Sequence, residues 1–105
     1  MATKISVANV PANRTETEIK SVFGEAGKVV HVELLKNQKT GERLESCTVT
    51  FANEDEAVKA YLEIDGDFLG GSKPIKIRFY DSSLQEAAEK GLLGPFSGKK
   101  RKHFK

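Results

Sequence analysis

Two basic residues and one aromatic residue occupy every second position over residues 76–80. Lys76, Arg78 and Tyr80 stand two residues apart, so they share one face if this segment is a strand. Ammonium and guanidinium groups bind phosphate oxygens, and the face of an aromatic ring can stack on an unpaired base. In an arbitrary protein such strand cations are more often simply solvated, so the spacing makes these residues candidate contacts and leaves the ligand to be decided by the fold.

A second group of cations lies at the C-terminus. Residues 99–105 hold five of the 17 Lys and Arg residues and no acid, and they include the consecutive run Lys99, Lys100, Arg101 and Lys102. The remaining residues carry 12 bases and 15 acids, so their net charge is −3, whereas a nucleic-acid binder usually has a basic body. We expect the basic run to act as a phosphate clamp or a nuclear import signal.

Other reactive residue types lack partners at the spacing that their chemistry needs. His31 and His103 are far apart with no Cys or acid at metal-ligand spacing, and Asp65-Gly66-Asp67 is typical of a turn. Ser6 and Ser46 have no His and acid constellation around them. The sequence therefore predicts no enzyme, no metal and no cofactor.

The single cysteine, Cys47, falls on an inward-facing position of a predicted strand. We expect a buried structural thiol, because cysteine is among the most frequently buried residue types. A chain with one cysteine forms no internal disulfide, which suits a reducing intracellular compartment.

Two segments with an alternating pattern are expected to form the centre of a sheet. Residues 44–51 and 5–10 both alternate apolar and polar side chains, which predicts strands with one buried and one wet face. The outward positions of this pair carry the small side chains Ser6, Ser46 and Thr48, and we expect these to decide what the surface can do.

The remaining elements follow from caps and periodicity. We expect helices at 16–26 after the cap Thr15, at 54–64 after the cap Asn53, and at 83–90 behind a capping box that Ser83 opens. Strands are expected within 28–36, where His31 points outward, and around 75–78. The order β-α-β-β-α-β predicts an α+β fold, with a four-stranded antiparallel sheet, two helices on one face and an extra C-terminal helix.

The 105 residues are enough for one domain with a modest core. We expect a domain over 1–81, a C-terminal helix and apolar segment over 82–93, and a flexible basic tail over 94–105. No apolar run approaches the length of a membrane span, and no signal peptide is expected. The predicted core consists of Ile5, Val7, Ile19, Val22, Phe23, Val32, Leu34, Cys47, Val49, Phe51, Ala57, Ala60, Ile64, Ile75 and Ile77.

Over roughly residues 3–81 the chain resembles the RNA-recognition motif (RRM) family. Residues 5–10 match the family's hexamer motif, with Asn9 at its fifth position, and residues 44–51 match the inward half of its octamer. The Thr40-Gly41 pair, Ala57 and the Gly66-x-Phe68 turn also stand where the family has them. The resemblance implies the RRM fold and an RNA-binding module.

The stacking residues of the family are absent. Where the family has one aromatic on the first strand, two on the third and a Lys or Arg opening the octamer, this chain has Ser6, Ser46, Thr48 and Leu44. Each missing stack removes roughly 1–3 kcal/mol of binding free energy. The resemblance therefore implies a non-standard RRM.

Two functions remain open. In the first, the protein binds single-stranded RNA weakly in nuclear RNA processing, and the contacts come from His31, Lys76, Arg78, Tyr80 and the basic tail. We expect such a protein to be monomeric when alone and to have no membrane contact. In the second, the bare sheet face or the helical face binds a partner's peptide, or the chain's own third helix covers the sheet near Leu35 and Leu44. A subclass that binds a partner's tryptophan through an Arg-x-Phe loop is disfavoured, because a glycine stands at the Arg position.

Overall fold

The computed structural model describes residues 2–11 and 13–91 of the 105. Four strands form one antiparallel sheet in the order β2-β3-β1-β4, which confirms the predicted RRM arrangement with a C-terminal helix. The elements are β1 Thr3–Ala8, α1 Glu16–Ala26, β2 Val29–Lys36, β3 Arg43–Phe51, α2 Glu54–Ile64, β4 Lys76–Phe79 and α3 Ser82–Glu89.

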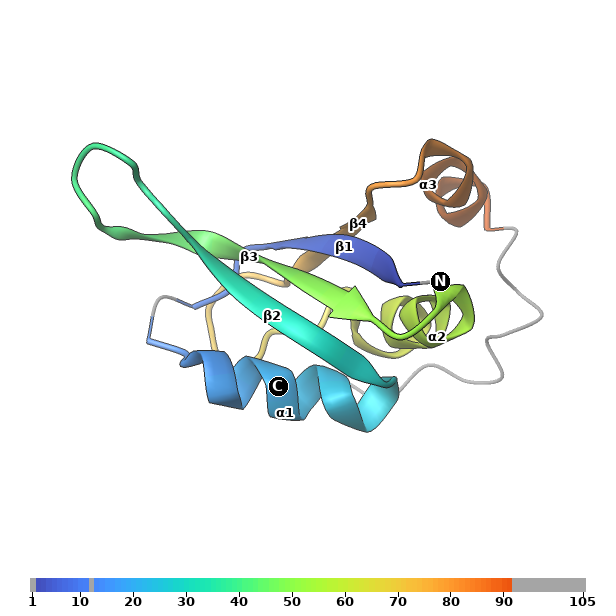
Figure 1. The fold of residues 1–105 in the computed structure, drawn as a ribbon, viewed down its shortest axis with the longest axis horizontal. Helices are drawn as coiled ribbons and strands as arrows, with labels where there is room; N and C mark the ends of the chain where they lie inside the picture. The colour runs from blue at the N-terminus through green and yellow to red at the C-terminus, as the bar shows by residue number, and fades with distance from the viewer. Residues whose placement is uncertain (1, 12, 92–105) are drawn as a thin grey trace.

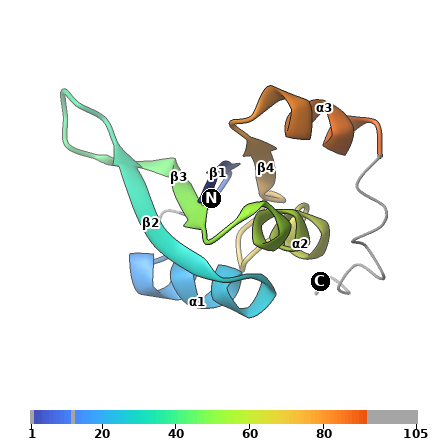
Figure 2. The same cartoon turned by 45° about the vertical axis from the view of Figure 1, so that its right-hand side comes forward.

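The sheet has one covered face and one open face. Helices α1 and α2 lie on the same side of the sheet, and α3 lies apart from both, beside β4 (Figures 1 and 2). The hairpin of β2 and β3 extends beyond the other strands (Figure 1). We call the side away from α1 and α2 the front face.

The core lies between the sheet and the two helices. The ring centres of Phe23 and Phe51 are 6.4 Å apart there. At the side of the core near β4, the ring centres of Tyr61 and Phe79 are 5.4 Å apart. The predicted core is confirmed except that Val22 and Leu34 are only partly buried against it. The prediction missed five buried residues: Val10, Ala26, Val58, Phe79 and Ala88.

The thiol of Cys47 is fully buried, as predicted, and this burial raises its pKa to about 11. The thiolate is the form that alkylating reagents attack, and it is scarce at neutral pH for such a pKa. We expect the native protein at pH 8 to resist iodoacetamide and to react within minutes once denatured, as measured by mass spectrometry. Rapid labelling of the folded protein would contradict the burial of this strand face.

The predicted caps of α1 and α2 are confirmed. The Thr15 hydroxyl accepts from the Glu18 amide at 3.1 Å while the Glu18 carboxylate accepts from the Thr15 amide at 2.9 Å. The Asn53 side chain accepts from the Glu56 amide at 3.1 Å. After α1, a Cβ at Gly27 would lie 2.5 Å from the Glu56 carbonyl oxygen, so only glycine allows this approach to α2.

The start of α3 differs from the prediction. The sequence pattern placed the cap at Ser83, whereas the structure begins α3 at Ser82 with Asp81 as its N-cap. The Asp81 carboxylate accepts from the Leu84 amide at 3.0 Å. A carboxylate caps as well as a hydroxyl and also interacts favourably with the helix dipole, which explains the earlier start.

Helix α3 closes the free edge of the sheet instead of covering Leu35 and Leu44. It contacts β4, and Leu44 on the distant β3 stays 41% exposed. Two side chains accept the outward amides of β4: Gln85 from Phe79 at 2.8 Å, and Asp65 from Ile77 at 2.8 Å. Unpaired amides on an edge strand can pair with a strand of another chain. The Ile77 and Phe79 amides of β4 are not free for such pairing, because both donate to side chains of the same domain.

Candidate nucleic-acid interface

The strand register arranges the front-face residues in rows that cross the sheet. Cα partners on neighbouring strands face the same way, so the rows follow the strand order β2, β3, β1, β4, and one of them spans all four strands. The first row is His31, Thr50, Lys4; the second is Glu33, Thr48, Ser6, Arg78; the third includes Ser46, Ala8, Lys76.

The exposed cations gather at the β4 side of this face. Lys76 and Arg78 lie on β4, and Lys4 on the neighbouring β1 is also exposed. His31 is exposed at the β2 edge, so two strands separate it from β4. The structure therefore brings Lys76, Arg78 and Tyr80 together and leaves His31 apart from them.

The sequence analysis missed Lys4. Its alternation with Ile5 and Ser6 could have identified it, because the register that turns Ile5 inward turns Lys4 to the front. In the structure its ammonium lies 5.9 Å from the centre of the Tyr80 ring.

The side chain of Tyr80 crosses the front face. Its backbone amide lies 3.5 Å from the Lys4 carbonyl oxygen, which places the residue beside β1 at the end of β4. Its hydroxyl lies 3.2 Å from the hydroxyl of Thr48 on β3, so the side chain spans β1. The residue remains 61% exposed, whereas Thr48, predicted to be wet, is only 5% exposed.

Two of the four motif positions, Ser46 and Leu44, lie farther along the front face toward the β2–β3 hairpin. Ser46 is half-buried, and Leu44 is one of the few exposed large apolar residues among those described. The predicted clamp residues Lys99, Lys100, Arg101 and Lys102 lie outside the described residues.

The cations of the face have one acidic neighbour on α3. An Arg78 guanidinium nitrogen lies 3.8 Å from a carboxylate oxygen of Glu89, and both side chains are 58% exposed. The same Glu89 oxygen accepts from the Gln85 amide group at 2.8 Å. Gln85 therefore links the β4 backbone to the acid that neutralises Arg78.

The two layers of the domain differ in charge. The strands contain five bases against the acids Glu33 and Glu45: Lys4, Lys36, Arg43, Lys76 and Arg78. Helices α1 and α2 contain the two bases Lys20 and Lys59 against seven acids: Glu16, Glu18, Glu25, Glu54, Asp55, Glu56 and Glu63. The strands thus carry a net +3 and helices α1 and α2 a net −5, and on the front face itself the bases Lys4, Lys76 and Arg78 stand against Glu33.

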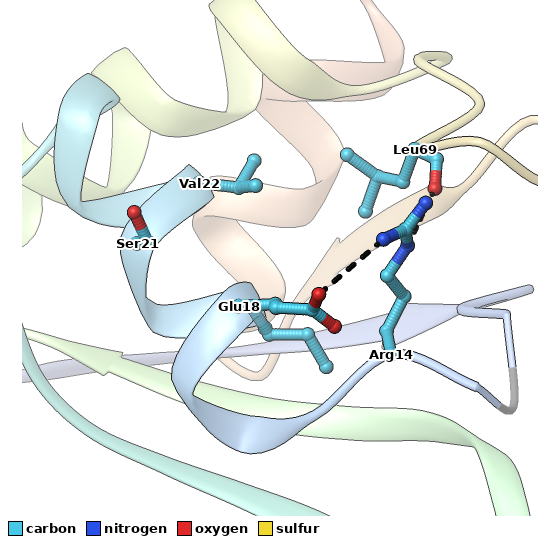
Figure 3. Close-up of a pocket in the computed structure, with 6 residues that line it drawn as sticks. Arg14, Glu18, Ser21, Val22 and Leu69 are labelled. Atoms are coloured by element: carbon cyan, nitrogen blue, oxygen red, sulfur yellow. Dashed lines mark hydrogen bonds and ion pairs between the residues drawn. The ribbon is translucent and has the colours of Figure 1, made fainter.

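A separate pocket lies on the helical side, where the start of α1 meets the segment after α2 (Figure 3). Its volume is about 360 Å³, and Ile19, Val22 and Leu69 contribute apolar lining. Arg14 bridges the two segments, since its Nε donates to the Leu69 carbonyl at 3.0 Å and its Nη1 lies 3.6 Å from Glu18 (Figure 3). The pKa of Glu18 is lowered chiefly by the hydrogen bond from the Thr15 amide.

Residues 2–11 and 13–91 contain no group of three or more His, Cys, Asp or Glu side chains that could hold a metal ion. Within the same ranges, no helix combines the length and the apolar character that crossing a bilayer requires.

The sequence and the fold match a known family. The family model for the RNA recognition motif matches residues 5–74, and the chain belongs to this family. Members of the family are RNA-binding modules and not enzymes.

Several curated proteins are similar in sequence. The flowering time control protein FCA of rice is 35% identical over 84 residues, which is 78% of this chain and 11% of that protein. The heterogeneous nuclear ribonucleoprotein D-like of Xenopus tropicalis is 33% identical over 91% of this chain and 33% of its own length. A 33 kDa chloroplastic ribonucleoprotein of Nicotiana sylvestris is 30% identical over 72% and 23%. The chain thus spans a third or less of these relatives.

Solved RRM structures share the fold. The first two RRM domains of yeast poly(U)-binding protein Pub1 align with a TM-score of 0.68 at 19% identity, over 76% of this chain and 48% of that one. A complex of the sex-lethal protein with RNA aligns with a TM-score of 0.63 at 28% identity, over 72% and 46%.

Proposed function

We propose that this domain binds single-stranded RNA weakly and mainly through phosphate contacts, which the front face of the sheet and the basic tail both supply. Lys4, Lys76 and Arg78 supply the cations, Tyr80 lies among them, and His31 offers a further contact at the β2 edge. The observation that carries the proposal is the charge difference between layers. An RNA strand is attracted to the basic sheet and repelled by the acidic helices.

The bare motif positions set the strength of binding. Ser6, Ser46 and Thr48 stand where three bases would stack, and each lost stack removes roughly 1–3 kcal/mol. Phosphate contacts then dominate, and the logarithm of the affinity should fall with the logarithm of salt concentration by about 0.7 per neutralised phosphate on a single strand. The basic tail would add contacts of the same kind.

The proposed process is nuclear RNA processing. The consecutive bases 99–102 fit an import signal, and one relative is by name a nuclear ribonucleoprotein. The chloroplastic ribonucleoprotein among the relatives belongs to a different compartment, so expression of a fluorescent fusion with and without residues 99–102 tests this part directly.

The test is a salt titration of a double variant, Lys76→Gln with Arg78→Gln, against a mixed RNA oligomer. We expect the salt slope to fall by about 1.4, because two phosphate contacts are lost. The matched control, Lys20→Gln with Lys59→Gln, removes the same charge from the helical layer and should leave the slope near that of the parent. Equal slopes for the two double variants would refute binding on the front face.

We expect Glu89→Gln to raise RNA affinity at low salt by up to about fivefold. The change releases Arg78 from its ion pair, and an exposed pair of this kind contributes about 0.2–1 kcal/mol. Glu86→Gln is the control, since Glu86 pairs with Lys90 on α3 and the charge change is identical. Equal gains for both variants, measured by fluorescence anisotropy, would show a general charge effect and no role for the Arg78 contact.

The pocket in Figure 3 supports a second candidate, a protein–protein adaptor. Its apolar lining and its Arg14–Glu18 rim suit a partner peptide that inserts one apolar side chain. Such binding should respond little to salt. An NMR titration of labelled protein with mixed RNA oligomers separates the candidates, because amide shifts at Lys4, Thr48 and Arg78 favour RNA binding, and their absence favours the adaptor.

A further inference from the structure

We infer that Tyr80 is the base-stacking platform of this domain and takes one unpaired base of single-stranded RNA. It would replace, from the end of β4, the aromatic side chains that β1 and β3 lack. This inference rests on the proposed RNA-binding function and adds to it one contact that does not depend on charge.

The first step is the path of the side chain. The Tyr80 backbone lies beside Lys4, and its hydroxyl reaches Thr48 on the far side of β1. Tyr80 lies level with Lys4, whereas Thr48 pairs with Ser6, so the side chain crosses β1 diagonally between Lys4 and Ser6. A large side chain at Ser6 would occupy that path. Ser6, which stands where the family has an aromatic residue on β1, is small enough to leave room for the Tyr80 ring.

The second step is the support of the ring. The Thr48 hydroxyl fixes the distal end of Tyr80 at 3.2 Å. The backbone is held on both sides, because the preceding Phe79 amide donates to Gln85 and the following Asp81 caps α3. A platform held at both ends binds with less loss of conformational entropy than a free side chain. Helix α3 therefore supports this surface.

The third step is the access and charge around the ring. Tyr80 is 61% exposed, far more than its contact Thr48, so the ring can receive a planar ligand. The Lys4 ammonium lies over the ring, 5.9 Å from its centre, and Arg78 pairs with Ser6 in the next row. A base that stacks on the ring takes the place of this ammonium, and Lys4 and Arg78 then remain on the same face to neutralise phosphates of the bound strand.

Tyrosine fluorescence can report the stacking of a base on Tyr80. The chain contains two tyrosines and no tryptophan, so Tyr61→Phe leaves Tyr80 as the single tyrosine. In this background an RNA oligomer should quench the tyrosine fluorescence, and an abasic oligomer of equal length and charge should bind without the same quenching. The Tyr80→Leu variant should lose about 5- to 150-fold in affinity for the RNA oligomer and little for the abasic one.

Two further variants separate stacking from other effects. Tyr80→Phe keeps the ring and should stay closer to the parent in affinity than Tyr80→Leu does. Ser6→Leu should block the crossing and weaken RNA binding as Tyr80→Leu does, with both melts checked by circular dichroism. Equal affinity for RNA and abasic oligomers with unchanged fluorescence would overturn the platform and leave electrostatic binding intact. No binding of either oligomer at low salt would overturn the platform and the proposed function together.

Discussion

Val49→Asp should abolish the cooperative unfolding transition of this domain. Val49 is fully buried in the middle of β3, where it pairs with Ile5 on one side and Val32 on the other. A carboxylate there has no charged partner, and burying it costs several kcal/mol, a large part of the roughly 5–15 kcal/mol of a typical domain. Thermal melts followed by circular dichroism and the dispersion of amide NMR signals measure the outcome.

The control for this variant is the next residue. Thr50→Asp introduces the same carboxylate on the front face, where the residue is half-buried and pairs with the exposed Lys4. We expect this variant to melt close to the parent. A cooperative melt of Val49→Asp near the parental temperature would mean that the strand register is displaced by one residue, because such a shift exchanges the two faces.

Deleting residues 99–105 should remove most of the measurable RNA affinity while leaving the fold intact. The deletion takes five positive charges from a chain whose other residues sum to −3, so the remaining protein repels RNA at long range. If all five bases neutralise phosphates, the salt slope falls by about 3.5, which corresponds to about three orders of magnitude in affinity at 0.1 M salt. Anisotropy titrations at several salt concentrations give both quantities.

A charge-preserving variant separates the charge of the tail from its other side chains. Replacing His103 and Phe104 with alanine keeps all five bases and should keep the affinity. Replacing the five bases with glutamine should reproduce the deletion. Equal affinity of the full-length and shortened proteins at low salt would exclude the clamp.

Much of the fold could be predicted because local physics determines it. Alternation along residues 44–51 separated the buried Cys47 and Val49 from the front-face Ser46 and Thr48, and the caps Thr15 and Asn53 placed two helix starts. The start of α3 was misplaced, because Asp81 and Ser83 are both good caps and sequence does not rank them. The absence of aromatics from the motif positions also needs only the sequence, since it is a matter of residue identity.

The tertiary structure alone decided what the front face presents. The amino-acid sequence established strands, faces and a basic end, but Tyr80 meets Thr48, 32 residues earlier, only because β1 lies between β4 and β3. The same strand order sets His31 apart from Arg78 and brings Lys4 beside the ring. Helix α3 lies at the β4 edge, where its Gln85 accepts from the outward Phe79 amide, while Asp65 after α2 accepts from the outward Ile77 amide. Such contacts depend on strand order and register, and no local pattern in the sequence encodes them.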